Sequence, residues 1–213
     1  MKDVIHQFKA PVLSGPDGNP LEIPDSLALR LRRSALDPDP CGEELVEALP
    51  HGFTEALFHF AREIAKEPVE HGLVISDQGK LLLRIRGSAT CVGIEKGFLR
   101  ESNLLHNHPA GTPPSREDIE ALFEANPSSV WVVGGPWLYG VKGGPEASKR
   151  PSLGQLRLFH DYFSQAAFAV IHDLFLHDST MEFASLEMRH LHAVLSELAE
   201  HGFLQYCRVP YGL

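Results

Sequence analysis

The sequence predicts an α/β fold, because the spacing of apolar residues alternates between a helical and a strand-like pattern along the chain. Residues 54–66 carry apolar side chains three and four positions apart, as an amphipathic helix does. A second helical pattern covers residues 115–125. Short apolar runs that predict strands lie at 72–76, 80–86, 130–133 and 137–141. Helices and strands in this order favour a sheet packed against helices.

Further elements are expected at both ends and in the middle of the chain. Residues 89–94 and 103–108 are predicted to be strands and residues 25–33 a short helix. The last quarter predicts helices alone, over 153–172 and 183–201. The expected organisation is an N-terminal extension, an α/β core and a C-terminal helical extension, at 1–52, 53–146 and 147–213.

The composition is that of an ordinary soluble globular protein. The chain has 213 residues, of which 43% are hydrophobic and 22% are charged. No apolar run approaches the about 20 residues that cross a bilayer, and residues 1–6 lack the apolar core of a signal peptide. The cysteines are odd in number and widely spaced, which is unlike a disulfide framework. We therefore expect a cytoplasmic protein with no membrane partner.

The charge balance argues against nucleic acid as a partner. Acidic residues number 28 and basic residues 19, for a formal net charge of −9. A protein that binds a duplex normally presents a basic surface. The densest basic cluster, Arg30, Arg32 and Arg33, has no interleaved aromatic residues and is interpreted as a solvated helix face.

The most informative motif is His106-Asn107-His108-Pro109. Side chains alternate along a strand, so both imidazoles would lie on one side and could reach one metal ion. Asp118, at the start of the next helix, could supply an oxygen ligand. Three such ligands leave one position of a tetrahedral zinc site open to water, which is the arrangement of a hydrolytic site. We expect one Zn²⁺ per chain.

Ser115 and Asp118 also have a purely structural interpretation. A serine followed three residues later by an acidic residue forms a capping box at a helix N-terminus. Pro109 ends the preceding strand, and a short loop rich in proline and glycine follows. The capping box explains the spacing of Ser115 and Asp118, but not its occurrence just after His-x-His-Pro.

Taken together, His-x-His-Pro, the short loop and Ser-x-x-Asp resemble the signature of the JAMM/MPN metalloprotease superfamily, over about residues 55–145. The resemblance implies a curved mixed sheet of the cytidine-deaminase-like type, flanked by helices. It also implies that His106, His108 and Asp118 bind zinc and that Ser115 helps to hold the oxyanion of the tetrahedral intermediate. The loop before Ser115 is one residue shorter than the family usually has, a change that loops accept easily.

The family also has a glutamate upstream, just before a glycine and an apolar run, and Glu70 matches this pattern. A water molecule at zinc needs a base that takes its proton and returns it to the leaving amine, and a carboxylate that does not bind the metal suits this role. Glu70 is therefore the predicted general base. The alternatives are Glu95, Glu101 and Glu117, or a Glu70 that only begins a strand.

The resemblance implies a zinc-dependent peptidase or isopeptidase that acts after the C-terminal tail of a ubiquitin-like protein. An extended tail would lie as an added strand beside the sheet. Three alternatives stay open: a RadC-like protein, which the string His-Asn-His-Pro-x-Gly favours, a phage-tail or toxin-type peptidase, and a metal-free scaffold. A homodimer is an alternative to a monomer, since family members often pair through helices.

The other histidines do not predict a second metal site. His190 and His192 repeat the His-x-His spacing, but on a helix they point about 200° apart and cannot share an ion. We interpret them, with His172 and His177, as surface or half-buried residues. His71 is adjacent to Glu70 and would face the opposite side of a strand.

Overall fold

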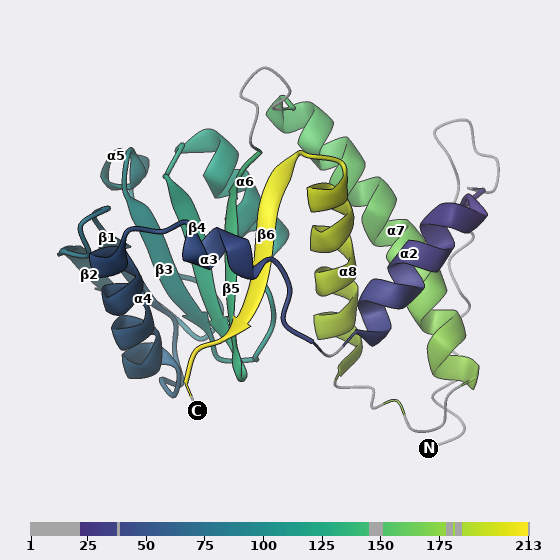
Figure 1. Ribbon diagram of the computed structural model, residues 1–213, viewed down its shortest axis with the longest axis horizontal. Helices are drawn as coiled ribbons and strands as arrows, with labels where there is room; N and C mark the ends of the chain where they lie inside the picture. The colour runs from purple at the N-terminus through teal and green to yellow at the C-terminus, as the bar shows by residue number, and fades with distance from the viewer. Residues whose placement is uncertain (1–21, 38, 145–150, 178–180, 182–184, 213) are drawn as a thin grey trace.

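The computed structural model describes residues 22–37, 39–144, 151–177, 181 and 185–212. In these residues, six strands form one sheet in the order β2-β1-β3-β4-β5-β6 (Figure 1). They are β1 (His71–Ile75), β2 (Leu81–Arg86), β3 (Asn103–His108), β4 (Ser129–Gly134), β5 (Trp137–Gly143) and β6 (Leu204–Pro210). Strands β3 and β4 are parallel and the other neighbouring pairs are antiparallel. The predicted α/β class, with a mixed sheet flanked by helices, is confirmed.

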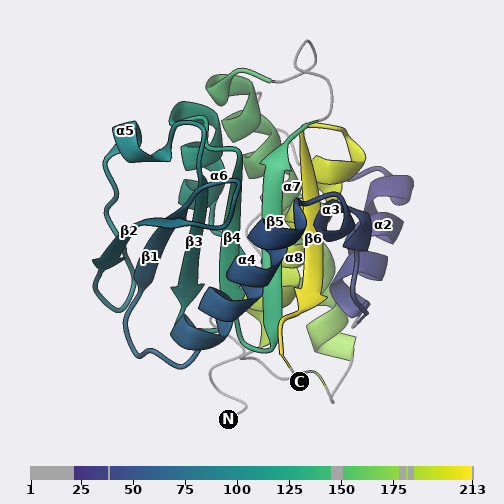
Figure 2. The ribbon, with the colours of Figure 1, turned by 60° about the vertical axis from the view of Figure 1, so that its left-hand side comes forward.

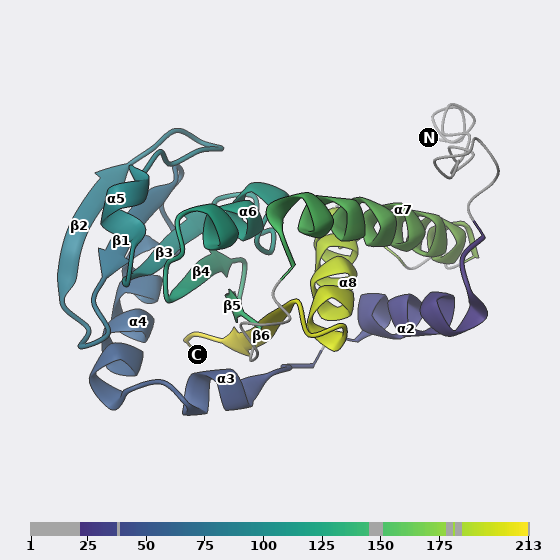
Figure 3. The same cartoon turned by 90° about the horizontal axis from the view of Figure 1, so that it is seen from above.

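Helices cover both faces of the sheet, as Figures 2 and 3 show. The first face carries α3 (Glu43–Glu47) and α4 (His51–Ile64), and the second carries α6 (Arg116–Glu124), α7 (Leu153–His177) and α8 (Leu186–Glu200). Helix α2 (Asp25–Leu36) packs against α7 and α8, and α5 (Lys96–Leu99) is a short turn between β2 and β3. Each face has its own apolar core.

Strand β3 contributes alternate residues to the two cores, as its period of two requires. Leu105 belongs to the core under α4, whereas Leu104 belongs to the core under α6, α7 and α8. His106 and His108 share the side of Leu104, and Asn107 shares the side of Leu105. The α6 side of the sheet is therefore the side on which the two imidazoles meet.

The basic cluster of α2 does more than face solvent. The Arg30 guanidinium donates to both carboxylate oxygens of Glu197 on α8, at 3.0 and 2.9 Å, and Glu197 is buried. The Arg32 Nη2 atom lies 2.9 Å from the Asp173 Oδ2 atom on α7. The side chains of Arg30 and Arg32 are 39% and 50% exposed, so the cluster is a solvated helix face as predicted, and two of its residues also join α2 to the C-terminal helices.

Two predictions of secondary structure are wrong. The C-terminus is not all helical, since residues 204–210 form β6, which pairs with β5 along its whole length. Residues 89–94 form a loop instead of a strand, in which the Ser88 N–H donates to the Cys91 carbonyl at 2.8 Å. Gly87 permits this fold-back, because a Cβ atom there would lie 2.2 Å from the Cys91 carbonyl oxygen.

Some expectations concern residues outside the described ranges. The domain boundary at residues 146 and 147 and the N-terminal residues 1–6, which lack a signal-peptide pattern, both lie there. Among the helices of the described residues, none has the length and apolar character to cross a membrane.

His192 is buried, so its interpretation as a surface or half-buried residue is wrong. It lies on the inner side of α8 at 4% exposure, and its Nδ1 atom is 2.8 Å from the Tyr206 hydroxyl on β6. Burial, helped by the positive charge of Arg208, lowers the pKa of His192 to about 3. The unfolded chain therefore binds a proton here at a pH where the folded protein does not.

This difference predicts an acid-sensitive fold. The contribution of His192 to stability is fully present above the unfolded pKa of about 6.5 and is lost progressively as the pH falls towards 3. Between pH 7 and pH 5 the loss is about 2 kcal/mol in the free energy of unfolding. Urea unfolding at the two pH values measures it. In His192→Asn, which keeps a hydrogen-bonding side chain beside Tyr206, the pH difference should shrink by about that amount, and an undiminished difference would show that other groups cause it.

Candidate metal centre

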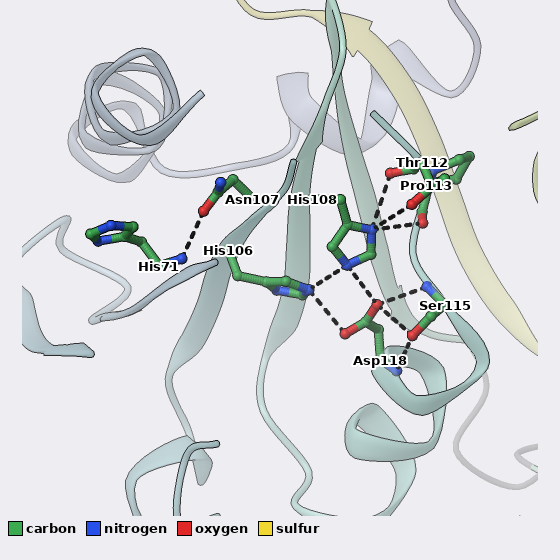
Figure 4. Close-up of polar contacts among 8 residues, drawn as sticks. All are labelled: His71, His106, Asn107, His108, Thr112, Pro113, Ser115 and Asp118. Atoms are coloured by element: carbon green, nitrogen blue, oxygen red, sulfur yellow. Dashed lines mark hydrogen bonds and ion pairs between the residues drawn. The ribbon is translucent and has the colours of Figure 1, made fainter. Parts of the chain in front are cut away.

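His106, His108 and Asp118 converge at the end of β3 and the beginning of α6 (Figure 4). The Nε2 atoms of the two histidines are 3.1 Å apart. The Asp118 Oδ1 atom lies 2.9 Å from His106 Nε2, and its Oδ2 atom lies 3.3 Å from His108 Nε2. The strand period and the helix start thus bring together three groups that can each offer a metal ligand atom.

The loop after β3 fixes the orientation of His108. Its Nδ1 atom lies 3.2 Å from the Thr112 carbonyl, 3.1 Å from the Thr112 hydroxyl and 3.1 Å from the Pro113 carbonyl. Carbonyl oxygens only accept hydrogen bonds, so Nδ1 carries the proton in the neutral ring. The Nε2 lone pair therefore points towards His106 and Asp118, as a metal ligand must.

This loop can lie close to β4 because β4 ends in glycine. A Cβ atom on Gly134 would lie 2.4 Å from the Thr112 carbonyl oxygen, closer than any contact that atoms tolerate. Gly111, in the same loop, has a φ of 79°, a conformation that glycine adopts without strain. The short Gly/Pro loop is thus shaped to bring its carbonyls to His108.

Ser115 caps α6 and holds Asp118. The Ser115 backbone N–H and hydroxyl both donate to the Asp118 Oδ2 atom, at 2.7 and 2.8 Å, and the Asp118 N–H points back to the Ser115 hydroxyl. The predicted capping box is confirmed. It orients the carboxylate so that Oδ1 faces His106, and the role of Ser115 towards an oxyanion stays a prediction.

The dimensions of the site suit a small divalent cation. In a tetrahedral zinc site with bonds of about 2.0–2.1 Å, neighbouring ligand atoms are about 3.3 Å apart. The separations of 3.1, 2.9 and 3.3 Å between the two Nε2 atoms and the carboxylate oxygens are close to this value. In the described part of the chain, no second cluster of three or more His, Cys, Asp or Glu side chains has such a geometry.

The charges of the site also suit a bound cation. Burial opposes ionisation of Asp118, but the charge and hydrogen bonds of His106 and His108 hold the pKa of the carboxyl well below its usual value. Burial also opposes protonation of His108, yet the hydrogen bond and charge of Asp118 outweigh it and raise the His108 pKa. Asp118 is therefore an anion that attracts positive charge to this point, whether a proton or a metal ion.

Glu70 lies beside this group, in the segment between α4 and β1. It is 7% exposed, and burial is the largest cause of its raised pKa. The negative charge of Asp118 raises the pKa further, whereas His106, His108 and a hydrogen bond from the Val92 backbone N–H lower it. A carboxylate with a raised pKa next to the candidate ligands has the properties of a general base.

The competing glutamates are placed differently. Glu95, Glu101 and Glu117 are all exposed, and none is among the main causes of the pKa shifts of Glu70, His108 and Asp118. His71 points away from the site, as Figure 4 shows, which agrees with its expected position on the other side of the strand. Glu70 is the one of the four glutamates that the structure brings to the candidate metal ligands.

Several groups of the site were not predicted from the sequence. The carbonyls of Thr112 and Pro113 and the N–H of Val92 belong to the backbone, which carries no residue-specific signal. Asn107 is different, because its position between two histidines on a strand already places its side chain on the opposite face. That signal was present in the motif.

Comparisons with known proteins add nothing to this geometry: no family model, no curated protein and no solved structure matches the chain. The interpretation of the site therefore rests on its own residues.

Proposed function

We propose that the protein is a zinc-dependent peptidase or isopeptidase of the JAMM/MPN type. The observation that carries this proposal is the convergence of two imidazoles and a carboxylate within 4.8 Å of one another, with the buried carboxyl of Glu70 beside them. A purely structural cluster has no need of a raised-pKa carboxyl at its side. The combination of a metal-ligand set and an adjacent base is typical of a hydrolytic site.

Zinc is the favoured metal because of the donor set. Imidazole nitrogens suit zinc, whereas magnesium and calcium prefer oxygen ligands alone. Three protein ligands are also the number found in catalytic zinc sites, which leave one position open. A zinc ion held by His106, His108 and Asp118 would polarise a carbonyl and lower the pKa of a water molecule.

The residues around the ligands would transfer the proton, bind the oxyanion and orient His108. Glu70 would take a proton from the attacking water and deliver it to the leaving nitrogen, and its raised pKa favours this return step. Ser115 would keep Asp118 oriented and donate a hydrogen bond to the developing oxyanion when its hydroxyl turns from Asp118. Thr112 and Pro113 would keep the His108 Nε2 atom deprotonated and aimed at the metal.

The proposed substrate is the C-terminal tail of a ubiquitin-like protein, linked to an amine by a peptide or isopeptide bond. The resemblance of the motif supports this choice. The sheet also supports it, since β2 is an edge strand beside β1, next to the Glu70 segment, and an extended peptide can pair with such an edge.

The proposal is tested by metal analysis and cleavage on the same preparation. We expect about one zinc per purified chain and cleavage of ubiquitin-like fusions directly after the tail. Removal of the metal with dipicolinate should stop cleavage, and added zinc should restore it. Linear fusions and lysine-linked conjugates in parallel distinguish a peptidase from an isopeptidase.

Two results would contradict the proposal. Stoichiometric zinc without hydrolysis of any fusion or conjugate would favour a scaffold. Hydrolysis that persists in the metal-free protein, verified by elemental analysis, would exclude metal-assisted chemistry.

A further inference from the structure

Asn107 stands between the two histidines of the motif, but its side chain points to the other face of the sheet (Figure 4). It is 1% exposed, on the side of α4. Its Oδ1 atom accepts a hydrogen bond from the His71 N–H at 2.7 Å, and its Nδ2 atom donates to the carbonyls of Val69 and Glu67 at 3.1 and 3.3 Å. One buried amide thus binds three backbone groups of the segment between α4 and β1.

Two of these backbone groups flank Glu70 directly. The Val69 carbonyl belongs to the peptide group before the Glu70 Cα atom, and the His71 N–H belongs to the peptide group after it. The orientations of these two peptide groups define φ and ψ of Glu70. A side chain that binds both therefore sets the direction in which the Glu70 side chain leaves the backbone.

The same two peptide groups also contain the N–H and the carbonyl of Glu70 itself, which form hydrogen bonds on the opposite side. Its N–H donates to the Ser88 carbonyl and its carbonyl accepts from the Gly87 N–H, both at 2.7 Å. The pairing of β1 with β3 ends at Gly72 and His106, so β3 offers no backbone partner to the residues before Gly72. The Asn107 amide takes over this task one residue beyond the end of the ladder.

We propose that Asn107 is a positioning residue for the general base: it fixes the backbone of Glu70 so that the carboxyl reaches the water at the metal. This inference rests on the proposed function for the role of Glu70. It adds a role for the middle residue of His-x-His. Strand β3 carries the two candidate metal ligands, His106 and His108, on one face, and Asn107, which holds the Glu70 backbone, on the other.

Asn103 provides a matched control. It lies on the same strand and the same face, is 3% exposed, and its amide donates to the Asp77 carboxylate at 2.8 Å and accepts from the Ser129 hydroxyl. It is at the opposite end of β3 from His108. Asn103→Ala removes a buried amide of the same kind without touching the Glu70 segment.

The first measurement is amide hydrogen exchange at residue 71, followed by NMR on the zinc-loaded protein, and it requires no substrate. In Asn107→Ala we expect exchange to become about 10-fold faster or more, because the bond to Oδ1 is lost. In Asn103→Ala it should stay as in the wild type. Asn107→Leu, which fills the same space without hydrogen bonds, repeats the test without a cavity. Unchanged exchange in both Asn107 variants would overturn the proposal.

The second measurement separates kcat from KM on a fusion that the wild type cleaves. In the Asn107 variants kcat should fall about 10-fold to 100-fold, since misplacement of a catalytic group by an ångström costs on that order, with KM and zinc content retained. Equal losses in Asn103→Ala would overturn the proposal, because they would reflect general destabilisation. A wild-type protein that cleaves nothing would instead refute the proposed function, while the exchange result still decides whether Asn107 holds the segment.

Discussion

Glu70→Gln is expected to eliminate nearly all hydrolysis and to leave the metal content unchanged. Glutamine has the shape of glutamate and can still accept from the Val92 N–H, but it cannot take a proton from water. Proton transfer by a positioned side chain contributes about 100-fold to 10,000-fold to a rate. We expect a loss of kcat within this range, measured on a ubiquitin-like fusion, with zinc determined on the same sample.

Glu67→Gln is the matched control for this substitution. Glu67 lies in the same segment, but its carboxylate is 42% exposed and lies 3.6 Å from the His71 Nε2 atom, away from the metal centre. Its variant should cleave at the wild-type rate. Full activity in Glu70→Gln would show that the base is wrongly assigned.

The candidate metal centre could be predicted from the sequence because its information is local. The pair His106 and His108 needs only a strand, and Ser115 and Asp118 need only a helix start, for which the capping box is a strong signal. The loop between them is short and contains three prolines, which limits the paths that it can take. Strand, loop and helix together determine most of the geometry.

The two wrong predictions of secondary structure concern β6 and the loop 89–94, whose conformations depend on contacts with other parts of the chain. Strand β6 follows a helix and is mostly buried, so no alternation of polar and apolar residues marks it, and its partner β5 ends more than sixty residues earlier. The loop 89–94 has apolar residues like a strand, but its Cys91 carbonyl accepts a hydrogen bond from the Ser88 N–H and lies close to Gly87. Its Val92 and Ile94 side chains pack onto Gly72. Apolar content alone does not distinguish these outcomes.

The position of Glu70 depends on both kinds of information. Its place before Gly72 and an apolar run follows a recognisable pattern, yet its burial results from residues 87–92, which fold over it, and from Asn107, which lies beneath it. The loop that was predicted wrongly is thus also the one that provides the Val92 N–H to its carboxyl. Selecting Glu70 from the sequence does not by itself yield the environment that sets its pKa.

His106→Ala should remove zinc binding, and this loss is measurable without any substrate. Loss of a group that merely supports a ligand weakens metal affinity about 10-fold to 100-fold, so loss of a ligand should exceed 100-fold. Zinc should raise the thermal midpoint of the wild type, because an ion that binds only the folded state stabilises it. The variant should show neither zinc in elemental analysis nor a shift of its midpoint.

His190→Ala is a control for this substitution. His190 lies on α8, not on β3, and is half buried. Its Nε2 atom forms a hydrogen bond with the Ser164 carbonyl at 3.0 Å. The His190→Ala variant should keep zinc and the zinc-dependent shift. His106→Ala also leaves the Asp118 carboxylate without the neighbour that contributes most to its low pKa, so its metal-free form should be less stable than the wild type at pH 7. If His106→Ala kept the zinc-dependent shift, the ion would bind elsewhere, and the imidazole pair of β3 would not be the metal centre.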